Sequence, residues 1–310
     1  MTTILDNPSQ ARPPKSLREV STHTKTRHRR NRATTWILAF ATYVACVPLI
    51  LIVTTVLYQG VQVMTPNFFL TDPLTARSSD GGFRVGFVGT FYIMFLAVPM
   101  TLIVGIATAI YLTEYGKGRT ATLVRFVTDI MTGVPSIFVG LFVYAVLVLG
   151  TGPAALNLGF GTFVGAVAIS IIMLPIVIRS SEEMLKLVPI NLRSAAFGLG
   201  ARRYQTVFRV VLPAAGPGLT TTALLAIARG IGETAPLLLT ILGTVHMTFA
   251  FQGEPQGALP MLIHNNAVQP FLEGQMRAWG GALSLILICL LLTIIGKIYS
   301  RRRAKLHNNA

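Results

Sequence analysis

The sequence predicts an all-α membrane protein with six transmembrane helices. Of its 310 residues, 52% are apolar and only 12% are charged, and the mean hydropathy is +0.63. Soluble domains carry about 25% charged residues. The chain also contains long stretches without a charge, as needed for a bilayer crossing of about 20 apolar residues. Its Lys and Arg residues gather between alternate stretches, which indicates a fixed orientation in the membrane.

Six apolar stretches define the predicted spans. The third and fourth come from one uncharged stretch, residues 130–178, which is too long for a single crossing and is interrupted at Gly150–Pro153. In chain order the spans are Trp36–Leu57, Val88–Leu112, Val134–Leu149, Phe160–Ile178, Pro217–Leu242 and a last span with its core at Gly281–Ile295.

The distribution of positive charge predicts that both termini are cytoplasmic. Basic residues crowd the two ends of the chain and the inner loops, whereas the outer loops hold only Arg77, Arg84 and Arg277. This pattern explains the net charge of +15, so the charge does not indicate a nucleic-acid partner. We expect a basic, disordered cytoplasmic tail at residues 1–33, a transmembrane domain at 34–300 and a second cytoplasmic tail at 301–310. No cleavable signal peptide is expected, because the first apolar run is too long.

Arg229 and Glu233 lie inside the predicted fifth span, in a stretch with no other charge. Charged side chains within a membrane are costly and mark substrate or ion paths. A spacing of four residues brings both side chains to one helix face. The pair predicts a substrate pathway; the alternative is an ion pair that only holds the helix in place.

The sequence shows no arrangement of residues that is typical of a metal site, a nucleotide-binding site or a catalytic site. Cys46 and Cys289 are far apart in apolar segments, and the five histidines have no ligand spacing, so no metal site is expected. No nucleotide-binding loop or catalytic triad is found in the sequence. The chain is therefore predicted to be neither an ATPase nor another enzyme.

The inner loop of residues 188–213, here called the coupling loop, predicts two short helices joined at a glycine. Asn191 is the expected N-cap of the first, with Ser194 at its third position. Gly200 interrupts the helices, the second helix covers Ala201–Phe208, and Pro213 is where the chain re-enters the membrane. Such an element with an apolar face is a surface for a partner.

The coupling loop resembles the EAA loop of bacterial ABC importer permeases. The match consists of Ala195-Ala196, Gly200, Val210 and Leu212-Pro213 at the family spacing. The resemblance implies the type I importer permease fold, with this loop and Tyr204 docking into a cytoplasmic ATPase. Ser194 replaces the Glu of the motif, which removes a capping-box partner and weakens the predicted helix start.

Further motifs narrow the resemblance to permeases of phosphate-specific ABC importers, and among them to PstA over its sister subunit PstC. The matching segments are Asn67–Phe69, Gly89-Thr90, Thr132–Gly140, Leu174–Arg179, Glu182-Glu183 and Ala228–Leu237. This resemblance implies that Arg229, Glu233 and Thr234 line the phosphate path in a bacterial plasma membrane. It also implies a PstC-like second permease, two PstB-like ATPase subunits that bind the ATP, and a PstS-like external binding protein. No cofactor is implied for this chain.

Other classes of membrane protein remain open at this point. An ABC permease for molybdate, sulfate or an amino acid would share the coupling loop. An ion-coupled secondary transporter would show two related halves, and no repeat is seen. A membrane scaffold or sensor would move no solute.

Overall fold

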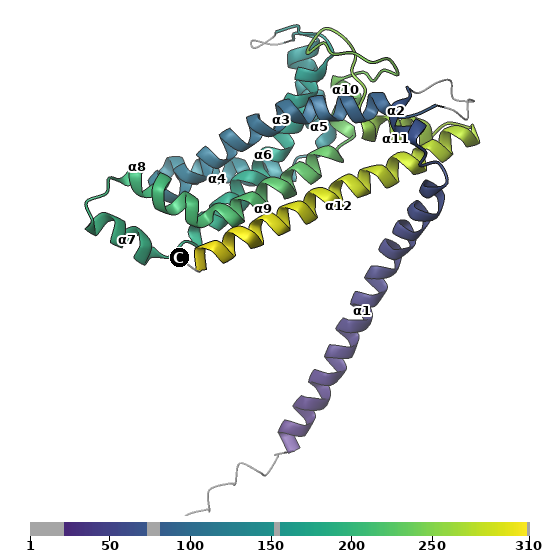
Figure 1. Ribbon diagram of the computed structural model, residues 1–310. Helices are drawn as coiled ribbons and strands as arrows, with labels where there is room; N and C mark the ends of the chain where they lie inside the picture. The colour runs from purple at the N-terminus through teal and green to yellow at the C-terminus, as the bar shows by residue number, and fades with distance from the viewer. Residues whose placement is uncertain (1–21, 73–80, 152–155, 309–310) are drawn as a thin grey trace, which may run out of the picture. The chain divides into compact units, whose positions relative to one another are not determined.

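The computed structural model describes residues 22–72, 81–151 and 156–308, and these residues are almost entirely helical (Figure 1). The chain divides into two compact units, Met1–Thr55 and Val56–Ala310. Across the described residues, β-structure is limited to one isolated bridge between Leu242 and Gln256. The all-α prediction is confirmed.

Helix α1, Thr22–Val61, contains the first predicted span and is long and apolar enough to cross a membrane. The helix begins earlier than expected, so the described part of the predicted disordered tail is helical. No Pro or Gly lies between Thr22 and Trp36 to stop the helix. At the other end, α12 covers Leu272–Asn308 and continues through most of the predicted second tail.

Four long helices form the core of the second unit. They are α3 (Arg84–Ile110, extended by the π-helical turn η2, Tyr111–Tyr115), α6 (Thr162–Lys186), α9 (Leu212–Ile231) and α12. Helix α6 packs against α3 and α9, and α9 packs against α12. Ile169, Met173 and Val177 of α6 are fully buried between these helices. The central position of α6 explains why it is the most buried span.

The third crossing is a bent pair of helices. Helix α4, Gly118–Gly133, meets α5, Ser136–Val143, and its π-helical extension η3, Tyr144–Val148, at 105°. Gly133 and Pro135 lie at the break, where a Pro cannot continue the preceding helix. The predicted span Val134–Leu149 corresponds to the second arm only. Pro153, part of the predicted break before α6, lies outside the described residues.

The fifth predicted span, Pro217–Leu242, is wrong as a single helix. A continuous helix runs from Arg203 to Ile231 through α8 (Arg203–Thr206), the π-helical turn η4 (Val207–Val211) and α9. The chain then breaks at Gly232–Thr234 and resumes as α10, Ala235–Thr240. Pro236 in the first turn of α10 lacks the N–H that an uninterrupted helix would need.

The segment between α10 and α12 is folded back on the helix ends. The hydroxyl of Thr90 in α3 accepts a hydrogen bond of 2.8 Å from the backbone N–H of Leu259, which begins α11, Leu259–Ala267. A Cβ at Gly89 would lie 1.9 Å from the carbonyl oxygen of Gly257, so only glycine permits this approach. The matched residues Gly89-Thr90 therefore hold this segment in place.

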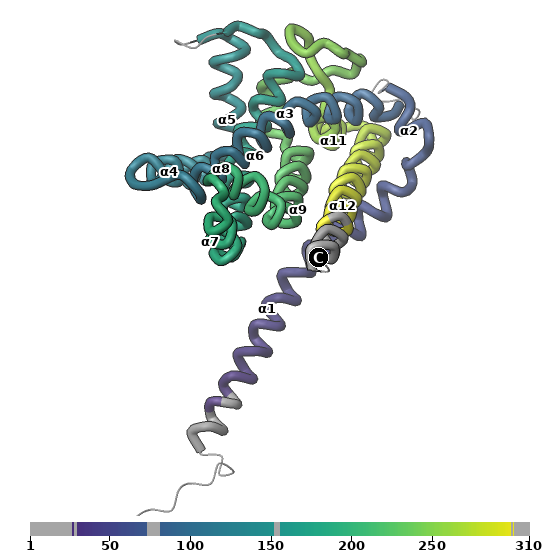
Figure 2. Tube along the Cα trace, turned by 60° about the vertical axis from the view of Figure 1, so that its left-hand side comes forward, coloured from purple at the N-terminus to yellow at the C-terminus, as the bar shows by residue number. Residues whose placement is uncertain are grey.

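Five described helices are long and apolar enough to cross a membrane, and the α4–α5 pair brings the number to six when it counts as one span. The short helix α2, Pro66–Leu70, precedes α3 and buries Phe68. Helix α7, Ile190–Gly198, and α8 lie together at the opposite end of α3 and α9 from α11 (Figure 2). The cytoplasmic placement of this end stays a prediction from the charge distribution.

Candidate functional site: an arginine beside an apolar cavity

The end of α9 brings Arg229 and Glu233 together. Arg229 lies in the last turn, and the N–H groups of Gly232 and Glu233 close that turn on the carbonyls of Arg229 and Gly230 at 3.2 and 3.3 Å. Glu233 stands in the break after the helix. Arg229 Nη2 is 3.2 Å from Glu233 Oε1, so the ion pair expected from the sequence forms although the helix ends between its members.

The two side chains of this pair differ in burial. The Arg229 side chain is 56% exposed and that of Glu233 is 14% exposed in the single chain. Glu233 is thus held against the protein and offsets the positive charge of Arg229. The remaining N–H groups of the Arg229 guanidinium are accessible, and a guanidinium presents five donors in a planar fork.

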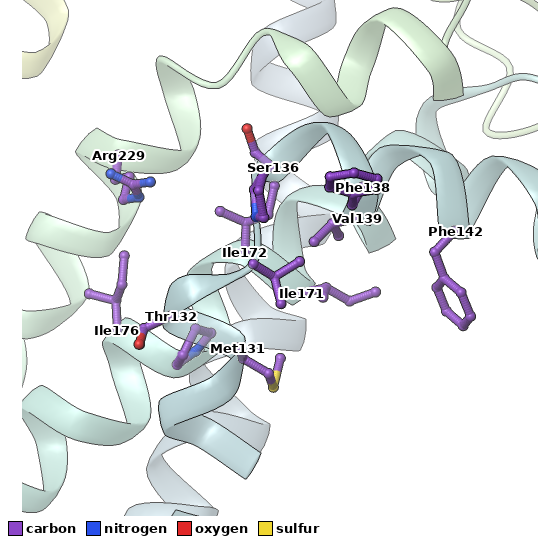
Figure 3. Close-up of a pocket in the computed structure, with 13 residues that line it drawn as sticks. Met131, Thr132, Ser136, Phe138, Val139, Phe142, Ile171, Ile172, Ile176 and Arg229 are labelled. Atoms are coloured by element: carbon purple, nitrogen blue, oxygen red, sulfur yellow. The ribbon is translucent and has the colours of Figure 1, made fainter. Parts of the chain in front are cut away.

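Arg229 borders a cavity of about 590 Å³ between α4, α5, α6 and α9 (Figure 3). Figure 3 shows Arg229 at one end of the cavity and Phe142 at the other, with Ser136 between them. Of the described residues that line it, Arg229 alone is charged, and Thr132 and Ser136 add hydroxyl groups. The apolar lining comes from Met131, Val134, Pro135, Phe138, Val139, Phe142, Ile171, Ile172, Pro175 and Ile176.

The wall of the cavity joins two of the segments singled out in the sequence. Helix α5 begins at Ser136 directly after the bend, and α5 packs against α10. A Cβ at Gly140 would lie 2.7 Å from Cα of Pro236, so the absence of a side chain permits this contact. The segments Thr132–Gly140 and Glu233–Pro236 therefore meet beside Arg229.

Thr234 has a backbone role in the structure. It is the N-cap residue of α10, and its carbonyl accepts from the N–H groups of Leu237 and Leu238 at 3.1 and 3.2 Å. It is not among the residues that line the cavity. A place for Thr234 in the substrate pathway stays a prediction.

The coupling loop contains the two expected helices but with shifted bounds. Helix α7 starts at Ile190 with Pro189 as its N-cap, so the predicted cap at Asn191 is wrong. Proline sets a fixed backbone angle two residues before Asn191, and the helix begins directly after it. Ser194 consequently lies at the fifth helical position, where the capping-box argument does not apply. Ala195 and Ala196 lie in α7, and Ala196 is buried.

Gly200 joins the two helices with a φ of +82°, a left-handed conformation that favours glycine. The second helix begins at Arg203, where the prediction had Ala201. The predicted end at Phe208 is wrong, because the helix continues into α9. Leu212 and Pro213 therefore lie within a continuous helix. Tyr204 is exposed, and Leu199, in the link, is 90% exposed.

Two buried acidic residues were not proposed as sites from the sequence. Glu182 of α6 is 1% exposed and is held by Arg125 (2.8 Å), Lys186 (2.7 Å) and Arg179 (3.5 Å), and Arg179 also pairs with Asp129. Glu114 of η2 pairs with Arg193 of α7 at 3.0 Å. Glu114 directly follows the uncharged stretch of residues 85–113, and Glu182 lies four residues after the stretch 130–178. This position is the signal that could have identified them.

The model of the family described as "Binding-protein-dependent transport system inner membrane component" matches residues 101–305. The fold is that of solved importer permeases. A chain of a bacterial alginate ABC transporter superposes with a TM-score of 0.67 at 12% identity, over 88% of this chain and 96% of that one. A chain of the MetNI methionine ABC transporter gives 0.56 at 18% identity, over 70% and 94%.

Curated relatives identify a narrower group within this family of transport permeases. "Phosphate transport system permease protein PstA 1" of Mycobacterium tuberculosis (strain CDC 1551 / Oshkosh) is 36% identical, over 79% of this chain and 80% of the relative. The PstA of Xylella fastidiosa (strain Temecula1 / ATCC 700964) is 41% identical over 69% and 73%, and that of Pasteurella multocida (strain Pm70) is 32% identical over 92% and 99%. The chain therefore belongs to this family of transport permeases, within its PstA group, and is a multi-pass protein of the cell membrane.

Proposed function

We propose that the chain is the PstA-type permease subunit of an ATP-driven importer of inorganic phosphate and forms half of the translocation pathway. The observation that carries the proposal is Arg229, a partly exposed guanidinium beside an apolar cavity in the PstA fold. A guanidinium binds tetrahedral oxyanions through paired N–H donors. An apolar surround strengthens this attraction, because the effective dielectric constant is low.

Glu233 gives the site a means of release. It holds one face of Arg229 at 3.2 Å, so an anion competes with a neighbouring carboxylate for the same guanidinium. Phosphate would thus be bound only transiently during passage. Glu233 would in addition accept a hydrogen bond from a protonated phosphate oxygen, and sulfate at neutral pH has no such proton. The alternative is that Glu233 only neutralises the charge of Arg229 and makes no contact with phosphate.

The proposal includes the partners of such importers. A second, PstC-like permease supplies the other wall of the pathway, beside the exposed side of Arg229. Two PstB-like ATPase subunits bind and hydrolyse ATP, and a PstS-like protein delivers phosphate from outside. The exposed apolar residues of the coupling loop support docking of an ATPase: Ile190, Phe197, Leu199, Tyr204 and Phe208. Ala195, Ala196, Gly200, Leu212 and Pro213 shape that surface.

The test is uptake by the purified complex in lipid vesicles. The chain is co-expressed with its partner subunits, and accumulation of phosphate, sulfate and molybdate is measured with ATP and with a non-hydrolysable ATP analogue. We expect ATP-dependent accumulation of phosphate in preference to the other two. Preferential uptake of sulfate or molybdate would show a permease for another oxyanion. Uptake that requires no ATPase subunit would identify a secondary transporter.

A further inference from the structure

We infer that Glu114 is the positioning residue through which the coupling loop moves helix α3. This inference rests on the proposed function, since it concerns how ATP-driven movement of the coupling loop reaches the substrate pathway. Helix α9 is joined to the coupling loop by the continuous helix Arg203–Ile231. Helix α3 is connected to the coupling loop through side chains, and the contact with Glu114 is an ion pair.

Glu114 forms a poorly exposed ion pair with two hydrogen bonds. Its side chain is 10% exposed and lies in the π-helical turn η2 that ends α3. Arg193 of α7, itself 17% exposed, approaches one oxygen of Glu114 with two nitrogens, Nε at 3.2 Å and Nη2 at 3.0 Å. A charge-assisted contact between two poorly exposed groups is stronger than a surface ion pair.

The remaining bonds of Arg193 show that Glu114 serves as the link. Arg193 also donates to the carbonyls of Val188 at 2.6 Å and Leu185 at 2.8 Å. Of the described acceptors of Arg193, Glu114 alone lies outside the segment from Leu185 to Val188. The backbone of the coupling loop therefore keeps its own support when Glu114 is removed, whereas the connection to α3 is weakened.

A second contact joins the same turn to the other helix of the coupling loop. The guanidinium of Arg203, the first residue of α8, lies 5.0 Å from the ring centroid of Tyr115. This is cation–π distance. The turn η2 thus contacts both α7 and α8, one on each side of Gly200. A displacement of the coupling loop as a body would pull on η2 through two adjacent residues.

Helix α3 must follow α9 because the two pack closely beside Arg229. A Cβ at Gly230 would lie 3.1 Å from Cε of Met94 in α3 and 2.5 Å from Sδ of Met173 in α6. Movement of α9 without α3 would open a gap or a clash in this dense packing. The Glu114–Arg193 contact makes α3 move with α9, so that the packing of Met94 against Gly230 is kept during the transition.

The first experiment compares Glu114→Ala with Asp72→Ala in the complete complex in vesicles. Asp72 forms an ion pair of 2.6 Å with Arg84 at the opposite end of α3, so it is a matched control for loss of a carboxylate from an ion pair to that helix. Coupling free energies between sites are ordinarily worth about 5- to 150-fold, so we expect phosphate transported per ATP to fall by about tenfold in Glu114→Ala. Asp72→Ala should keep the native ratio.

A double-mutant cycle assigns the effect to the contact. If Glu114 acts through Arg193, then Glu114→Ala should lower transport per ATP much less in an Arg193→Ala background than in the native chain. Glu114→Gln retains an oxygen acceptor at the same position and should give an intermediate ratio. A purely structural role predicts lower complex yield with an unchanged ratio, and that result would overturn the inference.

The second experiment does not depend on the identity of the substrate. Spin labels are placed at Ile103 of α3 and Leu225 of α9, both exposed, and their separation is measured with and without ATP. In the native complex we expect one narrow distribution that is the same in both states. Glu114→Ala should broaden or shift it on ATP binding, and an unchanged distribution would refute the link. A complex that fails to carry phosphate but shows this broadening would overturn the proposed substrate and leave the link standing.

Discussion

The Arg229–Glu233 pair and the group around Glu182 are both ion pairs within or next to the spans, but they are built in opposite ways. At Arg229 the cation is 56% exposed and contacts one carboxylate at 3.2 Å. At Glu182 the carboxylate is 1% exposed and three cations surround it. The first leaves donor groups accessible, and the second uses a buried acid to tie α4 and α6 together.

We propose that this difference distinguishes a charge in the substrate pathway from a structural one. Charges near a membrane are costly in both places, and the cost alone does not reveal the role. What separates them is the capacity left for a further partner. Glu182 is enclosed by its cations, whereas Arg229 borders a cavity and its side chain is more than half exposed. The predictions below test this contrast.

The largest effect is expected for Arg229→Ala. The guanidinium would supply the anion with charged hydrogen bonds, each worth about 1.5–3 kcal/mol, so we expect phosphate uptake to fall by roughly 100-fold or more. Arg229→Lys should restore little, because an ammonium lacks the planar fork. The measurement is ATP-dependent phosphate uptake in vesicles, with complex yield determined in parallel.

The double variant Arg229→Ala with Glu233→Ala separates the two readings of this pair. Removing both charges relieves the unpaired carboxylate, so assembly should return to the native yield. We expect transport to remain absent. Recovery of transport in the double variant would reduce the pair to a structural ion pair.

A smaller effect, on stability and not on the transport ratio, is expected for Glu182→Ala. It leaves Arg125, Arg179 and Lys186 without their shared carboxylate, and a hydrogen bond to a charged group contributes about 1.5–3 kcal/mol. The thermal midpoint and yield of the complex should fall, while phosphate transported per ATP in the surviving complex stays native. Lys186→Ala is the control, because this lysine is largely exposed and exposed pairs contribute about 0–1 kcal/mol. Native stability of Glu182→Ala would contradict the structural role.

The smallest effect concerns the contact between α5 and α10 in the cavity wall beside Arg229. Gly140→Ala places a Cβ 2.7 Å from Pro236, and overpacking of this kind costs about 1–3 kcal/mol. Gly133→Ala adds the same atom at the end of α4, where nothing lies within 4 Å, and should leave stability unchanged. Thermal unfolding of the purified complexes compares the two. Equal stability would mean that α5 and α10 do not pack as closely as described.

The spans and the charged pair could be predicted from the sequence because burial in lipid leaves a plain signal, the absence of charge. The Arg229–Glu233 contact was predicted correctly, although the prediction assumed a continuous helix across both residues. The helix breaks after Ile231, yet the last turn still places the two side chains within reach. The breaks themselves were harder to locate, because Gly232 and Pro236 lie within an otherwise apolar run and span length alone does not reveal a break.

The contacts made by Glu114 and Glu182 depend on the assembled fold. Glu114 is 79 residues from Arg193 in the chain, and Glu182 is 57 from Arg125. No local pattern links residues so far apart; their partners are set by how α3, α4, α6 and α7 pack. The start of α7 differs from the prediction for a local reason, because Pro189 and not Asn191 is the N-cap of the helix.

The uninterrupted helix from Arg203 to Ile231 has a consequence for timing. At 1.5 Å per residue, about 39 Å separates Arg203 from Arg229, so a tilt of about 5° about one end displaces the other by about 3 Å. A displacement of that size is comparable to the Arg229–Glu233 separation of 3.2 Å. A small tilt of this rigid helix at the coupling loop would thus open or close the Arg229–Glu233 contact in a single step.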